Sequence, residues 1–197
     1  HGFLRWQGGQ RLFIRRTARL SAPTALQYLA GMLGFVFFMV VIEKRGETAL
    51  AASELLKNVY LMFMIPTWGF AGAANTYVSN LLGQRRPHDV MPVVWRIARM
   101  SLAFTAVFLL PFMLVPGGVL RIYTDLPQVL AMAQPITWVL VGALLLYSVS
   151  WVLLNSVIGT GATRWALAGE LASITVYCGY ISLAFYGFGA SVMVLWM

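Results

Sequence analysis

Glu170 is the residue in this chain with the clearest chemical potential, because it lies inside a long apolar segment. The chain has 197 residues, of which 60% are hydrophobic and 10% charged. A charge at membrane depth costs about 2.5–3.5 kcal/mol on insertion scales, so it tends to face a protein interior or a wet cavity. A carboxylate there can accept a proton, hold Na⁺ or attract a cationic molecule. Alternatively, it caps a neighbouring helix or pairs with an arginine near the membrane surface.

Other polar side chains in the apolar segments are paired or neutral. Glu54 and Lys57 are three residues apart, a helical spacing that predicts an intrahelical ion pair. Such a pair lowers the cost of insertion and needs no functional role, although the mouth of a cavity can use the same charges. Asn58 and Asn155 carry amides at helix depth. Hydrogen bonding between helices is their first expected use, and ion ligation through the carbonyl oxygen is the alternative.

Prolines predict bends next to some of these groups. Pro23 precedes Gln27 by four residues. A proline inside a helix removes a backbone hydrogen bond and frees carbonyl oxygens that can line a cavity. Gln27 would then offer a neutral polar contact at the bend, and Pro66 predicts a second bend in its own segment.

Enzymatic signatures are weak. The chain has two His residues and the single Cys178, and their spacing forms no metal-binding cluster. The segment 159–161 (GTG) is too short for a dinucleotide-binding loop and ends an apolar segment. We therefore predict neither an enzyme nor a metal or cofactor site.

The elements that must position these residues are membrane-spanning helices. The mean hydropathy of +0.78 is too high for a water-facing domain, and the net charge of +8 fits loops beside an anionic leaflet. Residues 1–20 are predicted to form a basic amphipathic lead-in at the cytoplasmic face, with a solvated linker as the alternative, and residues 21–197 a helical bundle. We expect spans at about 22–42, 48–82, 93–115, 129–158 and 165–186, and a truncated sixth at 190–197.

The second of these ranges is longer than a bilayer is thick, so it should tilt, kink at Pro66 or project from the lipid. One alternating set of connections holds ten arginines, whereas the other holds four basic residues. The positive-inside rule then places the arginine-rich side in the cytoplasm. We expect a multi-pass protein of a bacterial inner membrane, and we expect the chain to be part of a longer one.

The order of several motifs resembles the second half of a multidrug and toxic compound extrusion (MATE) transporter. They follow Pro23 as 37–43 (FFMVVIE), 46–53 (GETALAAS), 65–70 (IPTWGF), 73–84 (AANTYVSNLLGQ) and 155–161 (NSVIGTG). The resemblance implies twelve helices in two six-helix lobes that face each other across a V-shaped cavity. This chain would supply helices seven to eleven and the start of twelve, with the N-terminal lobe as its partner.

The resemblance also implies a secondary-active antiporter that exports organic cations or other amphipathic compounds in exchange for Na⁺ or H⁺. Similar proteins have a carboxylate in the seventh helix, where this chain has Gln27, and often another in the tenth, where it has Tyr147 among a few polar residues. Coupling is therefore expected at Glu170 or at an acid of the first lobe. Gln27, Asn58, Tyr147 and Asn155 are expected as neutral cavity residues.

Three alternatives remain open from the sequence. A lipid-linked oligosaccharide flippase of similar build would be expected to show more cationic groups in its cavity than Lys57 alone. A non-transporting membrane scaffold would leave the prolines and buried polar groups unexplained. A membrane-embedded enzyme would need His, Asp and Ser side chains brought together by the fold. No nucleic acid is expected as a partner.

Overall fold

A computed structural model describes residues 10–187 and 191–196. Parts of the predicted lead-in (1–9) and of the predicted sixth span (190 and 197) lie outside the described residues. Within the described ranges every regular element is helical, which confirms the predicted all-α membrane bundle.

Among the described residues, five helices are long and apolar enough to cross a membrane. They are α1 (Gln10–Glu43), α2 (Glu47–Gly83), α3 (Val90–Leu114), α5 (Pro127–Gly159) and α6 (Thr163–Ser182). Four short elements join or follow them: η1 (Pro87–Asp89), α4 (Pro116–Arg121), the π-helical η2 (Leu183–Gly187) and α7 (Val192–Leu195). Helices α2, α3, α5 and α6 begin and end within about four residues of the expected spans, whereas α1 begins twelve residues before its expected start.

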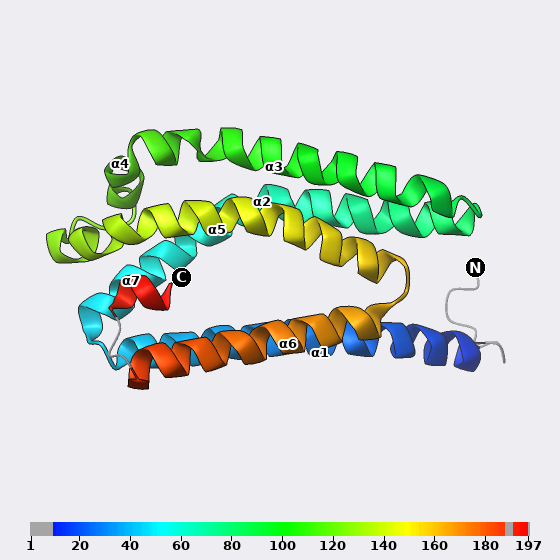
Figure 1. Cartoon of the computed structure of the whole chain (residues 1–197), viewed down its shortest axis with the longest axis horizontal. Coiled ribbons are helices and arrows are strands. Elements are labelled where there is room, and N and C mark those ends of the chain that lie inside the picture. The colour runs from blue at the N-terminus through cyan, green and yellow to red at the C-terminus, as the bar shows by residue number, and fades with distance from the viewer. Residues whose placement is uncertain (1–9, 188–190, 197) are drawn as a thin grey trace, which may run out of the picture.

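Two helices extend further than a single membrane crossing needs. Helix α1 begins at Gln10 and continues through Pro23, so the second half of the predicted lead-in is continuous with the first span. Helix α2 has 37 residues and continues through Pro66. At 1.5 Å rise per residue it is about 55 Å long, against a hydrocarbon layer of about 30 Å. Figure 1 shows α2 rising from the end of α1 and then turning to run beside α3.

The long helices form two groups (Figure 1). Helices α2, α3 and α5 pack against one another, and α1 packs along α6. Helices α1 and α6 run in the same direction, because each begins at the end of the molecule where α2 and α5 finish. This parallel pairing follows from a chain that alternates direction at every crossing.

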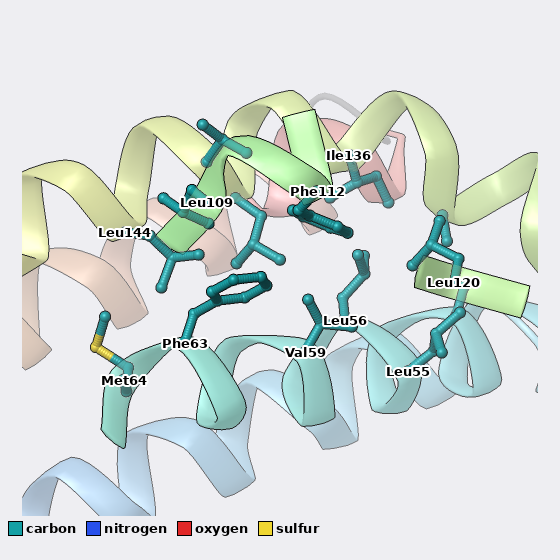
Figure 2. Packing of buried hydrophobic residues seen from close by; sticks show 14 of the residues in the cluster. Leu55, Leu56, Val59, Phe63, Met64, Leu109, Phe112, Leu120, Ile136 and Leu144 are labelled. Carbon is teal, nitrogen blue, oxygen red and sulfur yellow. The ribbon is translucent and has the colours of Figure 1, made fainter. Parts of the chain in front are cut away.

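The main apolar core lies in the first group. Phe63 of α2 meets Phe112 of α3 with 5.4 Å between ring centroids, and Leu144 of α5 completes the cluster that Figure 2 shows. A smaller cluster around Phe38 of α1 and Ile181 of α6 also includes Leu195 of α7. It lies where α1, η2 and α7 meet.

Helices α2 and α5 come very close at one glycine. A methyl group on Gly159 would lie 2.6 Å from the backbone oxygen of Asn75. The Oγ atom of Ser79 lies 2.9 Å from the backbone oxygens of both Asn75 and Gly159, so its one hydroxyl proton is shared between two acceptors. This position tolerates only glycine at the present helix separation.

Candidate functional site

The carboxylate of Glu170 lies between α6 and α1. The side chain is half-buried, and a methyl group built on Gly31 of α1 would lie 3.4 Å from its Oε1 atom. Gln27 precedes Gly31 by one helical turn, and its side-chain amide interacts with the same carboxylate. The absence of a side chain at Gly31 therefore leaves the space in which the carboxylate meets α1.

The side-chain amide of Gln27 has a buried acceptor without a hydrogen-bond donor in the described part of the chain. Only 3% of the residue is exposed, and its Oε1 atom has no hydrogen-bond partner among the described residues. A buried acceptor without a donor costs about 1–3 kcal/mol. Beside a carboxylate, such an oxygen is suited to receive a hydrogen bond from a protonated carboxyl group or to ligate a cation. The sequence predicted Gln27 as a polar contact one turn after Pro23, but it did not predict its closeness to Glu170.

Aromatic side chains from three helices surround this pair. Tyr147 of α5 stacks on Trp151 with 5.2 Å between ring centroids and an interplanar angle of 17°. Its ring meets Tyr60 of α2 edge-on at 5.9 Å, and Trp151 meets Tyr28 of α1 at 6.3 Å. Tyr28 directly follows Gln27 on α1, so this aromatic cluster adjoins the Gln27–Glu170 pair.

Four helices therefore contribute to one polar and aromatic region. Sequence reasoning named Tyr147 and missed Tyr28, Tyr60 and Trp151. The spacing of four residues between Tyr147 and Trp151 placed them on one helix face, but in an aromatic-rich apolar segment this spacing does not distinguish a site from a lipid-facing surface. The two faces of an aromatic ring attract cations, by about 0.5–2 kcal/mol.

The two asparagines named from the sequence have different surroundings. The buried Asn155 donates a hydrogen bond from Nδ2 to the backbone oxygen of Trp151 at 2.9 Å, so its amide serves its own helix. Asn58 lies exposed on α2. Neither has a contact with Glu170 in the part of the chain that the structure describes.

Glu54 and Lys57 form an ion pair within α2. The Lys57 side chain is 24% exposed and that of Glu54 46%. The Nζ atom of Lys57 also lies 5.9 Å from the ring centroid of Phe35 on α1. The pair thus links α2 to α1 and keeps the lysine charge locally balanced.

Within residues 10–187 and 191–196, no three His, Cys, Asp or Glu side chains gather into a cluster that could hold a metal ion. A cation bound next to Glu170 would have to take its other ligands from neutral oxygens, such as that of Gln27 and the tyrosine hydroxyls.

The family model MatE matches residues 23–178, a range that contains every residue named above for this region. The chain belongs to the MatE family. It is thus a multi-pass membrane protein of a transporter family, as the order of its motifs suggested.

Two known proteins extend this assignment. The MatE chain is 25% identical over 116 residues to the probable multidrug resistance protein NorM of Thermotoga maritima, an alignment that covers 59% of the chain and 25% of that protein. It also resembles a solved structure of a MOP superfamily transporter from Pyrococcus furiosus, with a TM-score of 0.83 and 15% identity. That match covers 92% of the chain and 40% of the transporter. The fold is shared, and the chain spans less than half of either relative.

Proposed function

We propose that this chain forms one lobe of a secondary-active antiporter that exports organic cations or other amphipathic compounds in exchange for H⁺ or Na⁺. In this proposal Glu170 binds the coupling cation, and the protein works in a bacterial inner membrane together with a preceding six-helix lobe. No cofactor other than the coupling ion takes part. The name of the NorM relative supports the export of drugs.

One observation supports the proposal above the others: the half-buried carboxylate of Glu170 interacts with the buried side-chain amide of Gln27, whose Oε1 atom has no hydrogen-bond partner among the described residues. A structural capping role for Glu170 would leave that oxygen without a donor. A proton on Glu170, or Na⁺ between the two oxygens, would satisfy it. A cation is therefore stabilised at this site, and a second cation that competes for the same negative charge can displace it.

The transport cycle follows from this competition. An inward cation gradient favours occupation of Glu170 from outside, and a cationic substrate entering from the cytoplasm competes for the same negative charge. Each ligand shifts the equilibrium between inward- and outward-open states only by its difference in affinity for the two states. The aromatic rings of Tyr147 and Trp151 add an attraction for flat cations that is independent of the carboxylate.

The flippase alternative needs cationic groups that hold a pyrophosphate. Lys57, the residue that sequence analysis offered for this role, is ion-paired with Glu54 and lies beside the Phe35 ring. Neutralisation by Glu54 weakens its attraction for a phosphate. The arrangement thus favours the exporter over the flippase.

The test is Glu170→Gln in the full-length transporter, reconstituted in liposomes and assayed for efflux of a fluorescent organic cation driven by a pH or Na⁺ gradient. We expect gradient-driven transport to fall by at least about tenfold, because the amide cannot exchange a proton or balance a cation. Glu43→Gln, at the exposed last residue of α1, is the matched control and should retain transport.

Folding is checked by the elution profile in detergent, and Glu170→Asp keeps the charge if Glu170→Gln aggregates. A folded Glu170→Gln protein with unchanged ion-driven efflux would remove Glu170 from the coupling mechanism. Loss of efflux in the Glu43→Gln control as well would show that the assay reports general damage.

A further inference from the structure

Two arginines lie on the outward face of α3, away from the helices that pack against it. The side of α3 that faces α2 and α5 is buried and includes Val94, Ala98 and Ser101. Arg96 and Arg99 lie on the exposed side. Figure 1 shows α3 at the edge of the bundle, with no further described helix beyond it.

The position of these arginines along the helix makes their exposure costly. They are the seventh and tenth residues of α3, so their Cα atoms lie about 9 and 14 Å along the helix from Val90. A lipid-facing arginine at such a depth must extend its side chain to the headgroups or meet an anion. Neither arginine forms an ion pair with any of the described residues, whereas Arg86, in the loop before α3, pairs with Asp89 at 2.7 Å.

The same surface is hollowed and mixed in character. A shallow groove, open to the surroundings, is formed by residues of α3 alone: Met91, Pro92, Trp95, Arg96, Arg99 and Met100. Trp95 is 44% exposed, and the two methionines are more than half exposed. Tryptophan is typical of the headgroup level of a membrane, and methionine adapts its shape to apolar chains. The groove thus combines two positive charges with an apolar wall.

We propose that this groove binds an anionic phospholipid of the arginine-rich leaflet. Arg96 and Arg99 hold the headgroup phosphate through charge-assisted hydrogen bonds, and Trp95 and the methionines contact the glycerol backbone and the first part of the acyl chains. The lipid fixes the outer helix of the α2–α3–α5 group at its cytoplasmic end. The proposal requires only that α3 spans the membrane, so it is independent of the role of Glu170.

The test uses the full-length transporter purified in a mild detergent. Native mass spectrometry measures the retention of phosphatidylglycerol and of phosphatidylcholine by the unmodified protein and by Arg96→Gln/Arg99→Gln. We expect selective retention of phosphatidylglycerol, and about 30-fold weaker retention in the double variant, since each arginine near the surface contributes a factor of about five. Arg121→Gln, an exposed arginine at the end of α4, is the matched control and should retain the lipid.

Three results would overturn the proposal. The first is equal retention of the two lipids by the unmodified protein, a measurement that does not depend on the folding of any variant. The second is release of phosphatidylglycerol by millimolar inorganic phosphate, which would indicate a site for a free anion. The third is a photo-crosslinker at position 95 that captures another segment of the full-length protein instead of lipid, because the groove would then be an internal contact.

Discussion

The two helix groups of this MatE chain differ in what holds them together. In the α2–α3–α5 group, large apolar side chains such as Phe63 and Phe112 are buried between three helices. The α1–α6 pair has a smaller apolar cluster around Phe38 and Ile181, and elsewhere it meets at glycines, with Gly31 beside Glu170 and Gly34 beside Ile174. In the most apolar stretch of α2, 44% of the segment is buried inside the protein, against 11% in the corresponding stretch of the span that begins with α6.

The comparison indicates that the two helix groups have different mechanical properties. Apolar surface gains little by leaving lipid, so helices in membranes associate mainly through close packing and hydrogen bonds. The first group has extensive packing and suits a rigid support. The α1–α6 pair has the smaller apolar cluster and holds the polar pair Gln27 and Glu170, so the proposed function predicts that ligands move this group rather than the first.

The largest effect on this comparison is expected for Phe112→Ala. The side chain is fully buried in the main core, and its removal leaves a cavity that should lower the free energy of unfolding by about 3 kcal/mol or more. Leu33→Ala on α1 removes a side chain that is 60% exposed, so it should cost under about 1 kcal/mol. Titration of the full-length protein with a denaturing detergent measures both. Equal losses would contradict the proposed difference between the groups.

A middle-sized effect is expected for Gly159→Ala. The new methyl group would lie 2.6 Å from the Asn75 backbone oxygen, so α2 and α5 must separate, at a cost of about 1–3 kcal/mol in the free energy of unfolding. Gly142→Ala on the same helix meets nothing within 4 Å and should be neutral or slightly stabilising. The same titration compares the two variants.

Gly34→Ala tests the same kind of close helix contact in the α1–α6 pair, for comparison with Gly159→Ala. Its methyl group would lie 3.2 Å from a side-chain carbon of Ile174. A side chain yields more easily than a backbone, so the cost should be smaller than for Gly159→Ala. A larger cost at Gly34 would mean that the α1–α6 pair is the more rigid of the two groups.

The smallest effect is expected for Thr67→Val. The hydroxyl groups of Thr67 on α2 and Thr105 on α3 are buried and lie 3.3 Å apart. A hydrogen bond between membrane helices contributes about 0.6 kcal/mol on average. A double-mutant cycle with Thr105→Val should recover a coupling of that size, whereas Thr76→Val, which removes an exposed hydrogen bond within α2, provides the reference. A coupling free energy near zero would show that this hydrogen bond does not stabilise the α2–α3–α5 group.

Some features of the candidate site followed from local sequence and others did not. A single carboxylate in an apolar segment identified Glu170, and the three-residue spacing of Glu54 and Lys57 indicated their pairing. The amide of Asn155 was expected between helices or at an ion, but it bonds to its own helix at Trp151. The positions of Tyr28 and Tyr60 beside Tyr147 were not predicted, because residues on different helices share no spacing.

The sequence by itself indicated five long helices in a membrane environment, because hydropathy is a local property, although it did not predict that α1 begins as early as Gln10. It also identified the family through the order of its motifs. Only the tertiary structure decided that α1 lies along α6 and that Gln27 meets Glu170. The physical reason is that these helices are apolar on all sides, so no polar stripe specifies which faces meet. That choice depends on close packing at small residues such as Gly31 and Gly159, which exists only once the helices are assembled.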